Sequence, residues 1–245
     1  MTAIVFGASG YTGRAVVRAL RERGVATVAH LRPESGSSSA PAAGATPSPR
    51  EALRAEWLSL GATIDSTPWD ADAITAMVVA RAPIVVFALL GTTKTKERAD
   101  RAAGRDSSYA AVDVGMSLMA LAGAQAAASR PRFVYLSALG TGPTALGAYY
   151  AARWQVEQAV VASGLPYVIA RPAIIGGDRE EARPGERFGL AVTDGILGAL
   201  AAVGVRGPKE RYGSRTAAQL GTALVRLGTA EGTASRVYRP EELNH

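Results

Sequence analysis

The sequence contains no cysteine and only two histidines, His30 and His245, at opposite ends of the chain. The absence of cysteine excludes disulfide bonds, thiolate nucleophiles and cysteine-ligated metals. Two histidines so placed argue against a His-based zinc site and a Ser-His-Asp triad, so we expect no metal. Lysine is also scarce: the only three are Lys94, Lys96 and Lys209.

Long apolar runs are missing as well. The longest, near "PIVVFALLG", is far shorter than the roughly 20 residues needed to cross a bilayer. We expect the first strand to start at Ala3, which leaves no room for a signal peptide, and we therefore expect a cytoplasmic protein with no membrane partner. The net charge is +6, but the arginines are spread along the chain without a dense basic block. The sequence thus predicts a small-molecule substrate rather than a nucleic acid as partner.

The chain instead shows strand-length apolar runs that alternate with segments of helical period. The predicted strands lie within 3–7, 25–31, 61–65, 83–90, 132–138 and 166–172, and the predicted helices within 12–23, 50–61, 70–82, 109–128 and 152–164. Several strands are apolar at consecutive positions, as in parallel strands that are covered on both faces. This alternation predicts an α/β fold with a Rossmann-type, doubly wound parallel sheet.

Two regions interrupt the alternation. Residues 33–49 are rich in Pro, Ser, Gly and Ala without large apolar side chains, which is typical of a flexible surface loop. From about 172 to 245 the pattern loosens, with helices expected around 188–203 and 215–228 and a short strand near "SRVYRP". We expect this C-terminal region to form a small substrate-side cap, within a single domain of residues 1–245.

The stretch "VFGASGYTGRAVV" places Gly7, Gly10 and Gly13 in a GxxGxxG pattern between the first strand and the first helix. Gly7 permits a tight turn, Gly10 lets the backbone approach a diphosphate, and Gly13 lets the helix pack closely on the sheet. The N-terminus of the helix favours phosphate groups. The pattern predicts that a dinucleotide binds along this turn, which also contains Ser9, Tyr11, Thr12 and Arg14.

The second strand ends in "VAHLRPE", with Arg32 where NAD-binding proteins carry an acidic residue. A guanidinium suits a 2′-phosphate, so the sequence predicts NADP as the cofactor, with Arg14 as a second cation. Asp65, at the end of the third strand, is either an adenine-side contact or an N-cap of the next segment. Leu90, Gly91 and Thr92 follow the fourth strand, where the cofactor should pass toward its nicotinamide end.

In "VYLSALG" and "YYAARWQVE", Ser137 follows the fifth strand, and Tyr149 and Arg153 lie one helical turn apart. With the glycine pattern, these residues resemble the short-chain dehydrogenase/reductase superfamily in its atypical or extended branches. "FALLGTTKTK" and "RPAIIGGDREEARPGERF" further resemble the Tat-interacting-protein oxidoreductase-like group, which is related to NmrA-like proteins. The resemblance covers nearly the whole chain except 33–49.

The resemblance implies catalytic roles. Tyr149 would exchange a proton with a substrate oxygen, Ser137 would hydrogen-bond that oxygen, and Arg153 would replace the family's lysine as the charge beside the tyrosine and as a ribose anchor. This replacement is a departure, because an arginine is bulkier and planar. Tyr150 has Trp154 four residues on, and a tryptophan cannot take the place of the family's lysine. Glu157 is expected to pair with Arg153, and 183–186 either line a substrate pocket or form a salt-bridged turn.

The sequence is compatible with three functions. The first is an NADP(H)-dependent oxidoreductase that reduces a carbonyl, or oxidises an alcohol, on a small organic substrate. The second is a regulatory protein that binds NADP(H) without turnover, as the NmrA-like resemblance suggests. The third is an isomerase or dehydratase on the same fold. The resemblance also makes a homodimer a candidate assembly.

Overall fold

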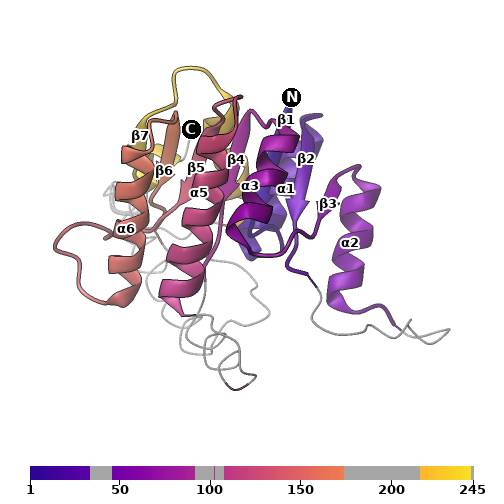
Figure 1. The fold of residues 1–245 in the computed structure, drawn as a ribbon, viewed down its shortest axis with the longest axis horizontal. Helices are drawn as coiled ribbons and strands as arrows, with labels where there is room; N and C mark the ends of the chain where they lie inside the picture. Colours follow the sequence, from indigo (N-terminus) through magenta and orange to yellow (C-terminus); the bar gives the residue numbers. More distant parts are fainter. Residues whose placement is uncertain (34–45, 92–101, 103–107, 174–215, 244–245) are drawn as a thin grey trace, which may run out of the picture.

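The structure is a computed structural model, and it describes residues 1–33, 46–91, 102, 108–173 and 216–243 (Figure 1). One sheet runs through the molecule in the order β3-β2-β1-β4-β5-β6-β7, with every neighbouring pair parallel. Its strands are β1 (Thr2–Phe6), β2 (Ala26–His30), β3 (Thr63–Asp65), β4 (Val85–Ala88), β5 (Arg132–Leu136), β6 (Tyr167–Ala170) and β7 (Arg236–Tyr238). The predicted doubly wound sheet is confirmed.

Helices follow the strands as the alternation predicts. They are α1 (Tyr11–Glu22), α2 (Pro49–Ser59), α3 (Ala71–Arg81), α5 (Ser117–Ala126), α6 (Ala148–Ala162) and α9 (Ala217–Thr229), with a 3₁₀ turn, η2 (Pro240–Leu243). One segment differs from the prediction: the helix expected over 109–128 begins as a π-helix, η1 (Tyr109–Met116), before it becomes α5. None of the described helices combines the length and the apolar character needed to cross a membrane.

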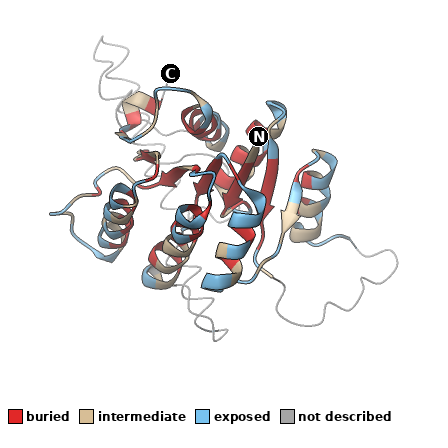
Figure 2. Ribbon diagram, turned by 45° about the horizontal axis from the view of Figure 1, so that its top comes forward, coloured by how far each residue is buried: buried red, intermediate tan, exposed pale blue. Residues whose placement is uncertain are grey.

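Two apolar cores sandwich the sheet, because neighbouring residues of a strand face opposite sides. Ala3 and Val5 of β1 pack toward α1 and α9, whereas Ile4 and Phe6 pack toward α3, α5 and α6. Figure 2 shows buried residues along the strands and on the inner faces of the helices. Burial on both faces explains why the strand sequences are nearly continuous apolar runs.

The described part of the C-terminal region completes this sandwich. The predicted helix near 215–228 is α9, which packs against α1, and the predicted strand is β7, which pairs with β6. Residues 216–243 therefore belong to the sheet and its helix layer. Most of the region expected to cap the strands, 174–215, lies outside the described residues, as do 34–45 of the predicted loop; Ser48 and Pro49 already form the start of α2.

Close packing of α1 and α9 depends on Gly221. A Cβ atom there would lie 2.7 Å from the Cβ of Ala15 and 2.9 Å from its carbonyl carbon. Glycine to alanine in a helix ordinarily stabilises by roughly 0.5–1 kcal/mol. We expect the opposite sign for Gly221→Ala, a loss of about 1–3 kcal/mol from overpacking, measured as the free energy of unfolding in urea.

Gly142→Ala is the control for this substitution, because a Cβ at Gly142 meets no atom within 4 Å. It should change stability by less than about 0.5 kcal/mol. A more stable Gly221→Ala protein would contradict the described helix packing.

Candidate functional site

The candidate site lies at the carboxyl ends of the parallel strands, where the strand order reverses between β1 and β4. Ligands of open α/β sheets bind in the crevice at such a switch point. Gly7 follows β1, and Leu89 to Gly91 follow β4. The two turns are in direct contact, since a Cβ atom on Gly7 would lie only 2.6 Å from the Leu89 carbonyl oxygen.

Each of the three positions in the turn favours glycine for a different geometric reason. Gly7 has a φ of 76°, in the left-handed region that favours glycine. Gly13 is in the first turn of α1, and a Cβ there would lie 2.1 Å from the Gly7 carbonyl oxygen. Gly10 is exposed, and its Cβ would approach only the Gly7 oxygen, at 3.1 Å. Packing therefore requires glycine at positions 7 and 13. Gly10, which has no side chain, leaves the exposed backbone of the turn uncovered.

The start of α1 suits an anionic ligand. Gly10 is its N-cap and offers no side-chain hydrogen bond, and the first turn contains no acidic residue. Backbone N–H groups and the positive end of the helix dipole are therefore available for negative charge. Arg14 adds a cation at this turn, where its Nε donates to the Ser9 carbonyl at 3.0 Å.

The end of β2 carries positive side chains and a neutral imidazole. Arg32 is exposed, and Arg50 of α2 donates a hydrogen bond to its backbone carbonyl. His30 is buried, with its ring centroid 5.2 Å from that of Phe6 and 4.9 Å from that of Trp69. Its Nε2–H donates to the Thr67 carbonyl at 2.8 Å. Burial lowers its pKa, so His30 is a neutral core residue.

Asp65 does not cap the helix that follows it, which corrects one of its two predicted roles. Its Oδ1 accepts a hydrogen bond from the Thr67 N–H at 2.9 Å, and its Oδ2 lies 3.6 Å from Arg81. The N-cap of α3 is Asp70, which accepts from Asp72 and Ala73. The predicted contact of Asp65 with the adenine remains a prediction.

Arg153 is buried and binds groups of three different segments. Its Nη2 lies 2.7 Å from Oδ1 of Asp113 in η1 and donates to the Leu90 carbonyl at 3.1 Å. Its Nη1 donates to the Leu136 carbonyl at 2.5 Å. The guanidinium thus links the turn after β4, the end of β5 and η1. The exposed fraction of Arg153 is 5% and that of Asp113 is zero, so this is an interior ion pair.

Two tyrosines adjoin this ion pair. The Arg153 guanidinium lies 5.3 Å from the ring centroid of Tyr149 and 5.6 Å from that of Tyr135, to whose hydroxyl Nη1 donates at 3.3 Å. Burial raises the pKa of Tyr135 to about 12, and Arg153 offsets only part of this shift. Burial on its own lowers the pKa of Arg153, but Tyr135, Asp113 and Tyr149 together raise it, so the guanidinium stays charged.

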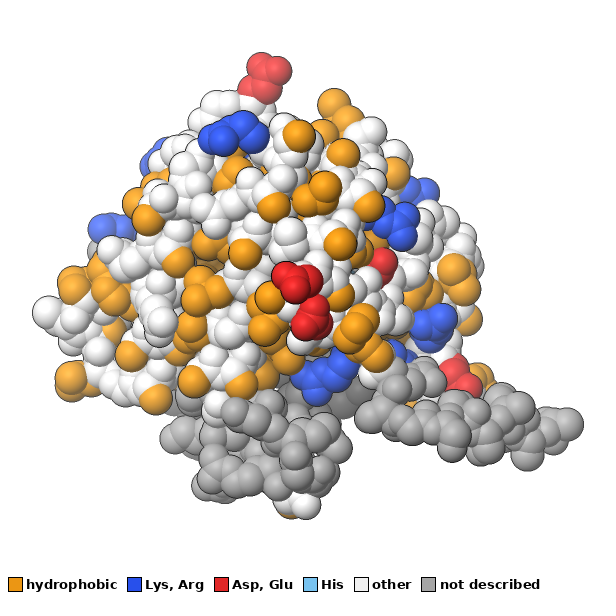
Figure 3. All heavy atoms as spheres, in the orientation of Figure 1, with side chains coloured by type: hydrophobic (Ala, Val, Ile, Leu, Met, Phe, Trp, Pro, Cys, Tyr) orange, Lys and Arg blue, Asp and Glu red, His pale blue; other side chains and the backbone are white. Residues whose placement is uncertain are grey.

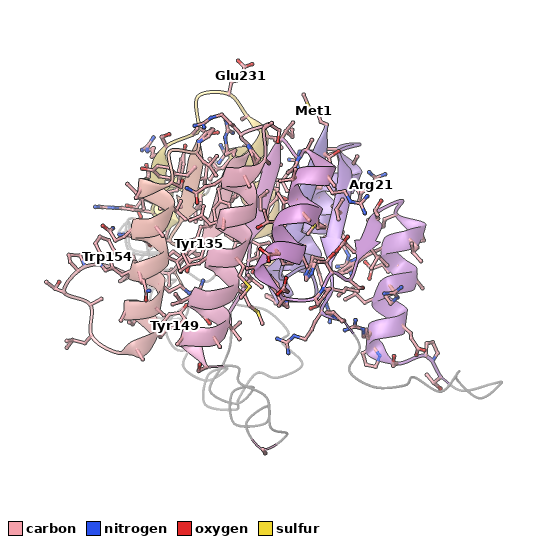
Figure 4. The ribbon with its side chains drawn as sticks, in the orientation of Figure 1. Met1, Arg21, Tyr135, Tyr149, Trp154 and Glu231 are labelled. Carbon is pink, nitrogen blue, oxygen red and sulfur yellow. The ribbon has the colours of Figure 1, made fainter. Side chains whose placement is uncertain are left out.

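Figure 4 labels both tyrosines: Tyr135 lies within the sheet, and Tyr149 lies nearer the carboxyl ends of the strands, at the start of α6. Tyr149 is half-buried, and its ring meets that of Tyr150 edge-on, with the two centroids 5.1 Å apart. The predicted pair Tyr149 and Arg153 is therefore brought together, with the charge over the face of the phenol ring.

Ser137 belongs to a second buried network. Its hydroxyl donates to Oε1 of Glu157 at 2.5 Å and lies 3.3 Å from the Thr141 hydroxyl. Both Glu157 oxygens accept from Arg171, at 2.9 and 2.5 Å. The expectation that Glu157 pairs with Arg153 is wrong: the two charges of α6 have separate partners, Arg171 and Asp113. The predicted role of Ser137 requires its hydroxyl to exchange Glu157 for a substrate oxygen.

The comparisons with known proteins bear on this geometry. The model of a family described as NAD(P)H-binding matches residues 7–189, which is more than half of the chain. The chain belongs to this NAD(P)H-binding family. No curated protein matches the sequence.

Solved structures share the fold. UDP-glucose 4-epimerase from Thermotoga maritima matches with a TM-score of 0.64 at 19% identity, covering 99% of this chain and 80% of that one. Isoflavone reductase matches with a TM-score of 0.64 at 15% identity, covering 99% and 73%. An NADPH-dependent quinone oxidoreductase from Escherichia coli, complexed with NADPH, matches with a TM-score of 0.58 at 17% identity, covering 98% and 68%. At these identities the matches show that the fold is shared.

The residues of this NAD(P)H-binding chain fit a dinucleotide. A Cβ at Gly7 or Gly13 would collide with backbone, and the exposed Gly10 leaves open the surface that a diphosphate would cover. The backbone of Ser9 to Gly13 would hold the diphosphate, and Leu90 and Gly91 would border the nicotinamide half. Thr92 and residues 183–186, which were also predicted to take part, lie outside the described residues.

Sequence reasoning missed Asp113 and Arg171, which hold Arg153 and Glu157. Asp113 lies in the π-helix, where the wider turn changes which side chains face the sheet, and periodicity alone gives no signal of that change. Arg171 is the residue directly after β6, and it lies 14 residues from Glu157 in the sequence. Neither pairing leaves a recognisable spacing in the sequence.

Removal of one partner from the Arg153–Asp113 pair should strongly destabilise the folded protein. Asp113→Asn leaves a buried guanidinium without its counter-charge, and we expect a loss of about 3–5 kcal/mol in the free energy of unfolding, measured by urea denaturation. The double variant Asp113→Leu/Arg153→Met removes both charges and should recover a large part of that loss.

Asp72→Asn, on the exposed first turn of α3, is the control and should change stability by less than about 0.5 kcal/mol. An Asp113→Asn protein as stable as this control would show that the ion pair does not hold β4 and β5 together.

Proposed function

We propose that the chain is an NADP(H)-dependent oxidoreductase that reduces a carbonyl, or oxidises the corresponding alcohol, on a small organic substrate. The observation that carries the proposal is the glycine turn at the switch point, next to a β2 end with an exposed arginine and no carboxylate among residues 31–33. Membership of the NAD(P)H-binding family supports the cofactor class. Several proteins with the same fold are reductases or oxidoreductases by name, which agrees with the proposed reaction class.

The adenosine side of the site accounts for the proposed choice of NADP(H). A 2′-phosphate carries a large negative charge and several acceptor oxygens, and an arginine can donate two parallel hydrogen bonds to them. Arg32 would make this contact from the end of β2, and Arg14 would add charge from α1. Among the described residues that follow β2, 31–33, no acidic residue occurs that would bind a ribose 2′-hydroxyl and repel the phosphate.

The proposed chemistry needs one proton and one hydride. The reduced nicotinamide, when bound, supplies the hydride. Tyr149 would hold the proton for the substrate oxygen, because its phenol lies beside the carboxyl ends of the strands and next to Arg153. Arg153 would act as a positioning residue, since its N–H groups hold the carbonyls of Leu90 and Leu136.

A second candidate function is binding of NADP(H) without turnover. The two buried networks favour this second function. The Ser137 hydroxyl donates its hydrogen bond to Glu157, and Asp113 balances the charge of Arg153. In that case the site would sense the cofactor or its redox state. Turnover measurements separate the two functions.

Substitution of Arg32 tests the cofactor preference. Arg32→Ser should weaken NADPH binding by about tenfold or more, because a charge-assisted contact is lost, and leave NADH binding within about twofold. Isothermal titration with each cofactor measures both constants.

Arg23→Ser is the matched control, since Arg23 is exposed at the far end of α1 and should affect neither cofactor. Equal affinities of the wild-type protein for NADPH and NADH would remove Arg32 from its proposed role.

Substitution of Tyr149 tests the chemistry. Consumption of NADPH is followed with a panel of aldehydes and ketones, and Tyr149→Phe should lower kcat about 10²-fold or more, as expected for loss of a proton donor. Its affinity for NADPH should be unchanged.

Tyr150→Phe is a close control, because this neighbouring ring contacts Tyr149 but has Trp154 rather than Arg153 one turn on. An unaltered kcat in Tyr149→Phe would contradict the catalytic role. Tight NADPH binding by the wild-type protein without turnover of any substrate would favour the second candidate function.

A further inference from the structure

Ser137 lies in a chain of buried hydrogen bonds that ends at a carboxylate. Its hydroxyl lies 2.5 Å from Oε1 of Glu157 and 3.3 Å from the hydroxyl of Thr141. The exposed fractions of Ser137, Thr141 and Glu157 are 4%, 5% and 1%, so all three groups lie inside the fold. Bulk water therefore competes little for these hydrogen bonds, and each group depends on the partners that the protein supplies.

The carboxylate of Glu157 is paired with Arg171, the residue directly after β6. The Arg171 Nε donates to Oε1 at 2.9 Å, and its Nη2 donates to Oε2 at 2.5 Å. A charged carboxylate has no proton and can only accept hydrogen bonds. The Ser137 hydroxyl therefore donates to Glu157, as a third donor beside the two N–H groups of Arg171.

The number of protons fixes the direction of the whole chain. A serine hydroxyl has one proton and two lone pairs, so Ser137 cannot donate fully to both of its neighbours. Its proton belongs on Glu157, because that distance is the shorter one and because a hydrogen bond to a carboxylate is roughly twice as strong as a neutral one. Toward Thr141, and toward any ligand, Ser137 can then act only as an acceptor.

The setting of α6 makes this arrangement costly to break. The helix contains two charged residues, Arg153 and Glu157, and both face the interior, where their partners are Asp113 and Arg171. Figure 3 agrees with this, since the surface over α5 and α6 shows mainly hydrophobic and uncharged side chains. A buried carboxylate that loses a donor is left partly unsatisfied, and water is not at hand to replace the donor.

We propose that Glu157 is a positioning residue that keeps the only proton of Ser137, so that Ser137 is an acceptor in the site and does not donate to a substrate oxygen. This inference rests on the proposed function, because it leaves Tyr149 as the donor to the carbonyl oxygen and removes Ser137 from the role that the family resemblance implies. Donation to a substrate carbonyl would exchange a charge-assisted hydrogen bond for a neutral one, which is unfavourable.

The first test measures how much Ser137→Ala lowers kcat in two backgrounds, with NADPH and the panel of aldehydes and ketones. The second background is Glu157→Leu/Arg171→Met, which removes both charges of the pair together and releases the Ser137 proton. Once released, the hydroxyl can donate to the substrate oxygen, and its removal is then the loss of an oxyanion donor. The loss of kcat should be at least about tenfold larger in the second background, and equal losses in the two backgrounds would overturn the inference.

The second test is thermal unfolding, which needs no substrate. Ser137→Ala should lower the thermal midpoint by about 4–8 °C, because the buried carboxylate loses a donor. Ser117→Ala is the matched control: Ser117 is fully buried in α5, and its hydroxyl has no hydrogen-bond partner among the described residues, so the midpoint should not fall. A Ser137→Ala protein as stable as this control would overturn the inference.

Proton NMR observes the hydrogen bond itself. Wild-type protein saturated with NADP⁺ should show a slowly exchanging, downfield hydroxyl signal that is absent from Ser137→Ala and from Glu157→Leu/Arg171→Met. Absence of this signal from the wild-type complex would overturn the inference. Failure of the proposed function is a different result: a wild-type protein that reduces no carbonyl would contradict the proposed reaction, and the midpoint and the NMR signal would still decide whether Glu157 keeps the proton.

Discussion

The close approach of two backbone turns, one after β1 and one after β4, is the constraint on which the rest of the site depends. Gly7 lies so near the Leu89 carbonyl that no side chain fits between them, and Gly13 lies even closer to the Gly7 carbonyl oxygen. This contact places the start of α1 at the point where the strand order reverses. The exposed surface of Gly10, the positive end of the helix and the turn through Gly91 then all lie at the carboxyl ends of β1 and β4. Membership of an NAD(P)H-binding family agrees with this arrangement.

A second constraint acts at the ends of β4 and β5, where Arg153 is buried. Arg153 replaces the lysine expected from the family resemblance, and its guanidinium is held by Asp113 and by the carbonyls that end β4 and β5. A lysine has one nitrogen and cannot span these three partners in the same way. Arg153 therefore holds the ends of β4 and β5 together beside the proposed site, and its predicted contact with the ribose remains a prediction. Proton exchange by Tyr149, whose ring adjoins Arg153, is likewise part of the proposal.

The fold was predictable because its signals are local. Apolar runs such as 83–90 and the helical period of 70–82 each depend on nearby residues, and the glycine spacing is diagnostic because it follows a strand and precedes a helix. The partners of the charged residues were not predictable. Glu157 was expected to pair with its helical neighbour Arg153, but the π-helical turn brings Asp113 to Arg153, and the end of β6 brings Arg171 to Glu157.

The central claim is that the bare backbone at the start of α1 binds the diphosphate of a nicotinamide dinucleotide. The most direct measurement is isothermal titration of NADPH into wild-type protein and Gly10→Ala, whose added methyl group would occupy the exposed side of the turn and meet only the Gly7 oxygen within the fold. The account predicts at least about tenfold weaker binding by Gly10→Ala with an unchanged thermal midpoint, since close backbone approach to the diphosphate is lost. Equal affinity in the two proteins would contradict it.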